Sequence, residues 1–375
     1  MTIQLHDNGK HLAFAPLTLT RPVGNLRIGI LTNDARWQAL VPDLDITFDT
    51  EDYLNVKFPN SSGRIVVNGC VIPNASLARQ IIELNNNEEL IFDNLWIARR
   101  GSGNSKVVFV GAPPLTIEHR WDLYKKNGAA IQNDFDILTS GRTSVQLSSS
   151  NTIIGDPGMI FMEEGAIVEA ALLNTKEGPI YIGKNAEIME GSMVRGPFAM
   201  NESSVLKLGT KVYGPTTLGP HCKVGGEVNN VVFQAYSNKG HDGFLGNSLV
   251  GEWCNIGADT NTSNLKNNYG IVRAYSYETN TLEETNLQFM GLTLGDHSKC
   301  GINTMFNTAT IVGVSCNIFG AEFPPKHVPS FSWGAHGEIF EFNKAIGGAN
   351  NMMSRRGLTL TDAEISILRH IADKN

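Results

Sequence analysis

The sequence predicts two folded parts, a small α/β domain over residues 1–150 and a parallel β-helix over residues 151–335. A tail and a terminal helix follow over residues 336–375. Three observations support this arrangement: a six-residue hydrophobic beat in the second part, mixed strand-like and helix-like runs in the first, and an amphipathic run at the end. A chain of 375 residues is long enough for two such units.

The first part lacks the six-residue beat and mixes short apolar runs with amphipathic ones. Strand-like runs occupy residues 64–67 and 107–110, and helix-like runs occupy residues 75–85 and 117–127. This mixture is typical of an α/β domain.

The second part repeats an aliphatic residue every six positions, often with Gly directly after it. Neither a helical period of 3.6 nor a strand period of 2 explains this spacing, whereas a coil of short strands does. Three units close one triangular turn, so sixteen units predict about five turns before weaker flanking units are added. The sixteen inward positions are Ile182, Ile188, Val194, Met200, Leu206, Val212, Leu218, Val224, Phe244, Val250, Ile256, Leu294, Cys300, Phe306, Val312 and Ile318.

The beat is interrupted at residues 226–243 and again at residues 262–289. Insertions in a solenoid project from one face, where binding usually occurs. Both segments are therefore candidates for a functional site, with simple surface loops as the alternative.

The chain ends in a run that favours an amphipathic helix. Thr361 and Glu364 have the spacing of a capping box, and Ile365, Leu368 and Ile371 share one face. We expect this helix to cover the open end of the β-helix or to pack on a neighbour.

Composition excludes several classes of function. The net charge of -7 and the pI of about 5.7 disfavour nucleic acid and anionic membranes as partners. No run approaches the roughly 18 apolar residues of a membrane span, and the start resembles no signal peptide, so we expect a cytoplasmic protein. The cysteines are five in number and form no C-x-x-C pair, which argues against disulfides and a zinc site.

The stretch NKGHDGFLGNSLVGEWCNIGADTNTSNLKNNYG, residues 238–270, adds a motif to the beat. Together they resemble the acetyltransferase half of the bifunctional N-acetylglucosamine-1-phosphate uridyltransferase and glucosamine-1-phosphate acetyltransferase, over about residues 180–320. The resemblance implies a left-handed β-helix, a homotrimer with active sites between subunits, acetyl-CoA as acyl donor and a sugar phosphate as acceptor.

The same resemblance implies roles for individual residues. His241 falls at the family's catalytic histidine, Asn255 and Asn264 at two sugar-contacting positions, and Ala258 at a backbone contact to acetyl-CoA. Gly320 keeps the coenzyme groove small. Without the resemblance, Asn residues in a β-solenoid also form structural ladders or turns.

An imidazole with a reference pKa near 6.5 takes a proton from an amine at neutral pH, so His241 is the expected general base. Backbone N–H groups near Gly257 and Ala258 would stabilise the oxyanion. Asp242, beside the histidine, either orients the imidazole or lies in solvent.

Several positions depart from the family pattern. Phe244 and Leu265 stand where the family has Tyr, and Ile302 stands where it has Ser. Asn229 and Asn230 replace a basic pair that holds phosphate, and we expect Lys239 and Lys266 to substitute for that pair.

The first part resembles a shortened sugar nucleotidyltransferase. In place of that family's Gly-rich loop stands PLTLTRPVGNLRIG, residues 16–29, in which Arg21 and Arg27 are candidates to bind the phosphates of a nucleoside triphosphate with Mg²⁺. The alternative for both arginines is a surface or interdomain salt bridge. Cys70 replaces a metal-binding Asp, and a neutral thiol is a poor Mg²⁺ ligand.

Three functions remain open at this point. The first is an acyltransferase acting on an amino sugar or its phosphate. The second is a sugar-1-phosphate nucleotidyltransferase whose β-helix is a trimer scaffold. The third is a non-catalytic protein that binds a sugar nucleotide.

Overall fold

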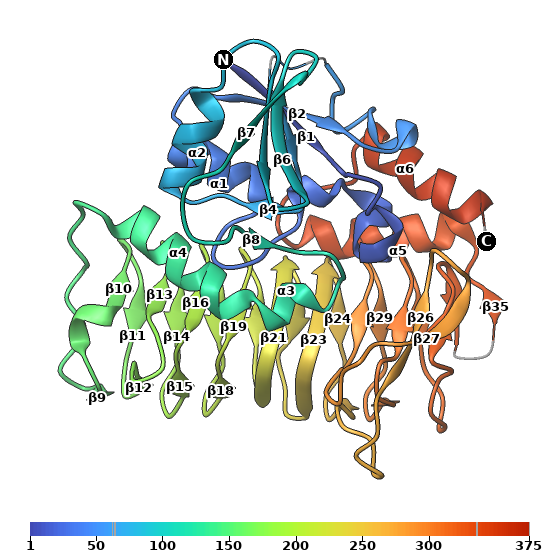
Figure 1. Ribbon diagram of the computed structural model, residues 1–375. Helices are drawn as coiled ribbons and strands as arrows, with labels where there is room; N and C mark the ends of the chain where they lie inside the picture. The colour runs from blue at the N-terminus through green and yellow to red at the C-terminus, as the bar shows by residue number, and fades with distance from the viewer. Residues whose placement is uncertain (62, 64, 335–336, 375) are drawn as a thin grey trace.

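The computed structural model describes residues 1–61, 63, 65–334 and 337–374. It shows an α/β domain lying along one side of a long parallel β-helix (Figure 1). The predicted fold class is therefore confirmed. The predicted boundary between residues 335 and 336 lies outside the described residues. No described helix is both long enough and apolar enough to cross a membrane.

The N-terminal domain contains a mixed six-stranded sheet and four helices, two of which lie against the β-helix (Figure 1). Strands β1, β2 and β3 are parallel, and β6 joins β3 in the antiparallel direction. The strands in sheet order are β2 (Asp45–Asp49), β1 (Thr2–His6), β3 (Ile65–Asn68), β6 (Leu95–Arg100), β5 (Glu88–Phe92) and β7 (Ser105–Val108). Smaller elements are the pair β4 (Val71–Ile72) and β8 (Leu115–Thr116), helices α1 (Asn33–Leu40), α2 (Ala75–Ile82), α3 (Asp122–Lys125) and α4 (Asn127–Thr139), and the 3-10 turns η1 (Leu12–Phe14), η2 (Leu17–Thr20), η3 (Val23–Asn25) and η4 (Asp52–Leu54).

The predicted elements of this domain are partly confirmed. β3, β7 and α2 lie where the pattern predicts them, and the side chain of Asn74 caps α2 by accepting from the N–H of Leu77 at 2.9 Å. Arg64, the first residue of one predicted strand, lies outside the described residues. The helix predicted over residues 117–127 is wrong for its first part, because only Asp122–Lys125 are helical there.

The β-helix has three walls, and each coil contributes one strand to each wall. The first wall contains β10 (Ile160–Met162), β13 (Ile180–Ile182), β16 (Phe198–Met200), β19 (Thr216–Leu218), β28 (Thr293–Leu294), β31 (Ile311–Val312) and β33 (His327–Val328). The second wall contains β11 (Ile167–Val168), β14 (Glu187–Ile188), β17 (Val205–Leu206), β20 (Lys223–Val224), β22 (Asn238–Lys239), β24 (Asn255–Ile256), β29 (Lys299–Cys300), β32 (Asn317–Ile318) and β34 (Ser332–Trp333), which pairs with β35 (Glu338–Ile339). The third wall contains β9 (Thr152–Ile154), β12 (Leu172–Asn174), β15 (Met193–Arg195), β18 (Lys211–Tyr213), β25 (Asn261–Thr262) and β30 (Met305–Phe306).

Two nine-residue strands, β21 (Glu227–Ala235) and β23 (Phe244–Glu252), turn a corner and belong to both the third and the first wall. The second wall has nine parallel strands, β11 to β34, in the part of the chain that the structure describes. The β-helix is thus longer than the five turns counted from the strict beat, because the flanking coils lack that beat.

The segment over residues 226–243 is a regular coil and not an insertion. Val228 and Phe233 of β21 point into the core, and Lys239 of β22 aligns with the inward residues Val224 and Ile256 on either side. The predicted inward position of Phe244 is also wrong. Its neighbour Leu245 is buried and aligns with Val228, whereas Phe244 is half-buried.

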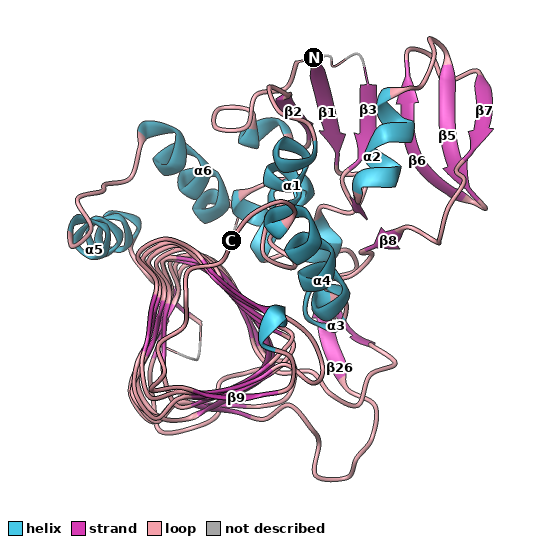
Figure 2. Ribbon diagram, turned by 90° about the vertical axis from the view of Figure 1, so that its left-hand side faces the viewer, coloured by secondary structure: helices cyan, strands magenta, loops and turns pink. Residues whose placement is uncertain are grey.

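The segment over residues 262–289 does project from the β-helix. It carries an antiparallel hairpin of β26 (Arg273–Ser276) and β27 (Thr281–Glu284), which leaves the coil beside the N-terminal domain (Figure 2).

The N-terminal domain and α4 cover the outer face of the first wall (Figure 2). The amide nitrogen of Asn127 donates to the Thr217 hydroxyl at 3.0 Å, and apolar side chains from both sides form continuous clusters. The wall residues in these clusters are Phe161, Tyr181, Ala199, Val232 and Leu249.

Two helices follow the β-helix, α5 (Phe342–Ser354) and α6 (Asp362–Asp373). The predicted capping box of Thr361 and Glu364 is present at the start of α6. This helix packs against the N-terminal domain and not over the open end of the coil. Lys57 pairs with Glu364 at 2.8 Å, and the rings of Tyr53 and His370 stack with their centroids 4.1 Å apart. α5 lies beside the corner that precedes the second wall, and was not predicted.

Candidate active site

A pocket of about 490 Å³ lies on the outer face of the second wall, between the C-terminal end of α5 and the corner that carries His241. We call it the α5 pocket. Its lining residues are Lys207, Lys223, Asn238, Gly240, His241, Asn255, Ile256, Gly257, Ala258, Ile302, Met352, Arg355 and Arg356.

The floor of the α5 pocket consists of outward-facing residues on consecutive coils. Lys223 of β20, Asn238 of β22 and Asn255 of β24 are direct partners in the parallel register. Neighbouring strands lie about 4.8 Å apart, so these three polar side chains form a ladder along the wall. The structure therefore places Asn255, a predicted sugar contact, in the same pocket as His241.

His241 lies at the corner after β22, and its exposed side chain borders the α5 pocket. Extending the strand register by two residues aligns it with Ala258, Ile302 and Gly320 on the next three coils. The predicted catalytic residue and both predicted coenzyme-contact residues thus share one corner. Gly257 is needed there, because a Cβ atom at that position would lie 2.3 Å from the carbonyl oxygen of Gly301.

A second pocket, also about 490 Å³, adjoins the first on the other side of the same corner. We call it the Asp242 pocket. It shares Lys207, Gly240, His241 and Ala258 with the α5 pocket and adds Asp242 and Asp259. His241 therefore lines both pockets.

Lys239 lies inside the coil and not in either pocket. Its side chain is 1% exposed, and its ammonium donates to the carbonyl oxygens of Gly225 and His241, both at 2.9 Å. Burial lowers the pKa of Lys239 to about 8, although the carboxylates of Asp242 and Asp259 oppose the shift. The prediction that Lys239 binds phosphate is therefore corrected, because its ammonium donates to backbone carbonyls inside the coil.

Two other predicted contacts also lie away from the α5 pocket. The amide nitrogen of Asn264 donates to the side-chain oxygen of Asn247 at 2.7 Å, and the ammonium of Lys266 donates to the carbonyl of Ile271 at 3.1 Å. Neither side chain lines the pocket that contains His241. The substitution of Lys266 for a phosphate-binding pair, and a joint role of Asn264 with His241 within one chain, are thus not supported.

The cations of the α5 pocket were missed by the sequence analysis. Lys207 and Lys223 come from the second wall, and Arg355 and Arg356 follow α5. The guanidinium of Arg356 donates to the carbonyl of His221 at 2.9 Å, which fixes this segment to the wall. Burial lowers the pKa of Lys223, and the charges of Arg356, Lys207 and Arg355 lower it further.

No Asp or Glu belongs to the described lining of the α5 pocket. The only sequence signal for this cluster is the adjacent pair Arg355 and Arg356, which has no acidic residue within several positions on either side. The two lysines are sixteen residues apart, and only the coil geometry brings them together.

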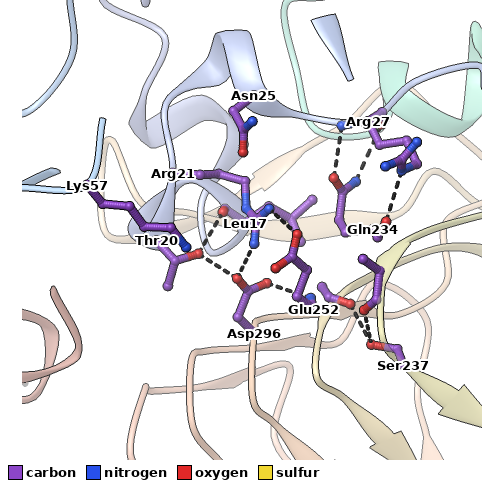
Figure 3. A network of polar contacts seen from close by, with 12 residues as sticks. Leu17, Thr20, Arg21, Asn25, Arg27, Lys57, Gln234, Ser237, Glu252 and Asp296 are labelled. Atoms are coloured by element: carbon purple, nitrogen blue, oxygen red, sulfur yellow. Dashed lines mark hydrogen bonds and ion pairs between the residues drawn. The ribbon is translucent and has the colours of Figure 1, made fainter. Parts of the chain in front are cut away.

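Arg21 and Arg27 lie at the interface between the N-terminal domain and the β-helix (Figure 3). The guanidinium of Arg21 donates to Glu252 at 2.7 Å and to Asp296. That of Arg27 donates to the carbonyl oxygens of Gln234 at 2.9 Å and of Ile30 at 2.5 Å. An interdomain salt bridge accounts for Arg21, whereas Arg27 is held by two backbone carbonyls and belongs to none of the described ion pairs. The assignment of both arginines to nucleotide phosphates is corrected.

Cys70 follows β3 and is buried. Its backbone N–H donates to the side-chain oxygen of Asn68 at 3.0 Å. Burial raises the pKa of its thiol to about 12, so the group is neutral at physiological pH. Within the described residues, no group of three or more His, Cys, Asp or Glu side chains is arranged to hold a metal ion.

Comparisons with known proteins identify relatives of parts of the chain. Residues 3–143 match a family model described as sugar nucleotidyl transferase. An uncharacterized acetyltransferase, YaiX, from Escherichia coli O6:K15:H31 is 21% identical over 175 residues, which is 46% of this chain and 75% of the relative. Both matches are to transferases, which confirms the predicted enzyme class.

Two solved structures match parts of this chain at low similarity. The polysialic-acid-specific acetyltransferase NeuO matches 52% of this chain and 90% of its own, with 13% identity and a TM-score of 0.27. The UDP-N-acetylglucosamine acyltransferase of Arabidopsis matches 57% of this chain and 78% of its own, with 16% identity and a TM-score of 0.22.

Proposed function

We propose that this protein transfers an acyl group from acyl-CoA, with acetyl-CoA as the expected donor, to an amino sugar or an amino-sugar phosphate. The observation that carries the proposal is the position of His241. Its exposed side chain lines both the α5 pocket and the Asp242 pocket.

His241 would act as general base. The attacking amine has to lose a proton, and an imidazole nitrogen is a suitable acceptor for it. The thioester of acyl-CoA supplies the activated acyl group. Backbone N–H groups at the corner of Gly257 and Ala258 are the candidates to stabilise the developing oxyanion. Asn255, on the pocket floor, offers both a donor and an acceptor to sugar hydroxyls.

The residues around His241 fit a phosphate-bearing donor such as acyl-CoA. Ala258 and Gly320 have small side chains, which leave space at this corner. A Cβ atom added to Gly320 would meet no atom within 4 Å. The cations of the α5 pocket are suited to phosphate oxygens.

We further propose that the protein acts as a homotrimer with this corner at the subunit contact. Leu208 and Ile302 lie on the same corner as His241, and their side chains are 68% and 72% exposed. Leu208 lies two coils before His241 and Ile302 two coils after it, and exposed large apolar side chains on both sides of His241 favour coverage of this corner by another copy of the chain. The Asn264 and Lys266 side chains, remote from His241 within one chain, would reach a site only across such a contact.

The test is a thiol-release assay with acetyl-CoA and a panel of amino sugars and their phosphates. We expect turnover with at least one acceptor and a loss of roughly 10²–10⁴-fold in kcat for His241→Asn, as is typical for a general base. His6→Asn, a substitution in the N-terminal domain, is the matched control and should retain activity. Absence of turnover over the whole panel, or an active His241→Asn protein, would refute the proposal.

The family match over residues 3–143 motivates a second candidate, a sugar-1-phosphate nucleotidyltransferase that uses a nucleoside triphosphate with Mg²⁺. Pyrophosphate release from these substrates tests it, and His241→Asn should leave that activity unchanged. Because Arg21 and Arg27 are held by the β-helix and Cys70 is a neutral thiol, we expect no such activity. Nucleotide-sugar binding without either turnover would favour a non-catalytic binding protein.

A further inference from the structure

The α5 pocket gathers positive charge on a protein whose net charge is -7. Lys207, Lys223, Arg355 and Arg356 line one hollow, and among the described ion pairs none joins any of these four side chains to a carboxylate. Like charges that share a site repel one another. Burial is the largest cause of the lowered pKa of Lys223, and the charges of Arg356, Lys207 and Arg355 add to it. An arrangement of this kind is stabilised when an anion binds.

Helix geometry explains only part of the cluster. Arg355 is the C-cap of α5, and a helix C-terminus favours cations because of its partial negative charge. That effect accounts for Arg355 and Arg356. It does not explain why Lys207 and Lys223 of the β-helix face the same hollow, since outward positions on the second wall are free to carry acids, as Glu187 does on β14.

The positions of the four side chains are fixed by the backbone and by one anchoring contact. Lys223 belongs to the ladder of β20, β22 and β24, and Lys207 follows β17 directly. The hydrogen bond from Arg356 to the carbonyl of His221 holds the end of α5 against this wall. The cluster is thus formed before any ligand binds, which reduces the entropic cost of binding.

We infer that Lys207, Lys223, Arg355 and Arg356 form a phosphate-binding subsite beside His241. Two arginines supply planar forks for phosphate oxygens, and two lysines supply point charges. The inference rests on the proposed acyl transfer only for the identity of the substrate that carries the phosphate. That phosphate belongs either to CoA, as its 3′-phosphate or diphosphate, or to an amino-sugar phosphate.

The experiment measures binding of inorganic pyrophosphate and of CoA to the full chain by titration calorimetry, at low and at high salt. Lys223→Gln and Arg355→Gln are the test variants, because neither side chain makes a hydrogen bond to another described residue. Lys211→Gln is the matched control: Lys211 also faces outward, on β18 of the third wall, and lies outside the α5 pocket.

We expect each test variant to weaken binding about tenfold, as the loss of one hydrogen bond to a charged group does. The affinity should also fall as salt rises, and Lys211→Gln should bind as the unaltered protein does. Unchanged affinity for pyrophosphate and CoA in both test variants, together with an unchanged KM for an amino-sugar phosphate, would overturn the inference.

Further measurements identify the source of the phosphate and separate this inference from the proposed function. If the 3′-phosphate of CoA is bound, dephospho-CoA binds the unaltered protein at least as weakly as CoA binds Lys223→Gln, and Lys223→Gln does not weaken its binding further. If the acceptor phosphate is bound, the two variants raise KM for glucosamine 1-phosphate and leave KM for glucosamine unchanged. His241→Asn should retain binding, so Lys223-dependent binding without turnover would refute acyl transfer and support the subsite.

Discussion

Replacing Arg21 by Met should destabilise the protein through the interface between the N-terminal domain and the β-helix. The guanidinium, 7% exposed, lies between Glu252 and Asp296 (Figure 3). Removing it leaves the Asp296 carboxylate, 4% exposed, without its cation. Breaking a buried ion pair from one side typically costs about 3–5 kcal/mol, because the remaining charge is buried and unpaired.

The remaining contacts of Asp296 place the expected loss at the lower end of that range. Its carboxylate still accepts from the Thr20 hydroxyl at 2.7 Å and from the Glu252 N–H at 2.8 Å. We therefore expect a decrease of about 3 kcal/mol in the free energy of unfolding. Arg195→Met is the matched control, since its ion pair with Glu177 at 2.8 Å is exposed and such pairs contribute at most about 1 kcal/mol.

Urea unfolding followed by tryptophan fluorescence and circular dichroism measures the difference. The double variant Arg21→Met with Asp296→Asn should regain part of the lost stability, because it removes the unpaired charge. Equal destabilisation by Arg21→Met and Arg195→Met would refute the reasoning. A double variant less stable than the single one would do so as well.

Three further predictions concern other buried groups. Lys239→Met should lower stability, because the carbonyls of Gly225 and His241 lose their donor, and should lower kcat about tenfold or more with unchanged CoA affinity; urea unfolding, steady-state kinetics and calorimetry check this. Because burial lowers the pKa of His297 to about 4, stability should fall as pH drops from about 6.5, the unfolded value, toward 4, and His297→Gln should flatten the profile of urea midpoints against pH. Burial raises the pKa of all five cysteine thiols, so a thiol reagent should label none in the folded protein and all five after denaturation.

The six-residue beat predicts the β-helix because one inward side chain per short strand is a local property of sequence. The beat fails where the coil changes the number of residues at a corner. Val228 and Phe233 are five residues apart, so the pattern shifts without any insertion. Lys239 breaks the pattern a second time, because an inward position is expected to be apolar. The lysine is accommodated there because its ammonium donates to two backbone carbonyls.

The candidate site divides in the same way. His241, Asn255 and Ala258 belong to one motif and lie on two successive coils, so their proximity follows from the repeat. The α5 pocket needs contacts between segments far apart in sequence. Arg356 meets His221 across 135 residues, and no local pattern predicts that α5 lies beside the second wall.

The energetics of the interface bear on the function of the N-terminal domain. To bind a nucleotide phosphate, Arg21 would have to leave Asp296. The Asp296 carboxylate would then be buried without its cation, which costs about 3–5 kcal/mol. One hydrogen bond to a charged group returns about 1.5–3 kcal/mol, which is less. Arg27 would have to give up its hydrogen bonds to two backbone carbonyls that are buried with it, and an acceptor left without a donor also costs free energy. The loop over residues 16–29 therefore fixes the N-terminal domain on the β-helix. It also contacts α6, which packs on α5 beside the α5 pocket.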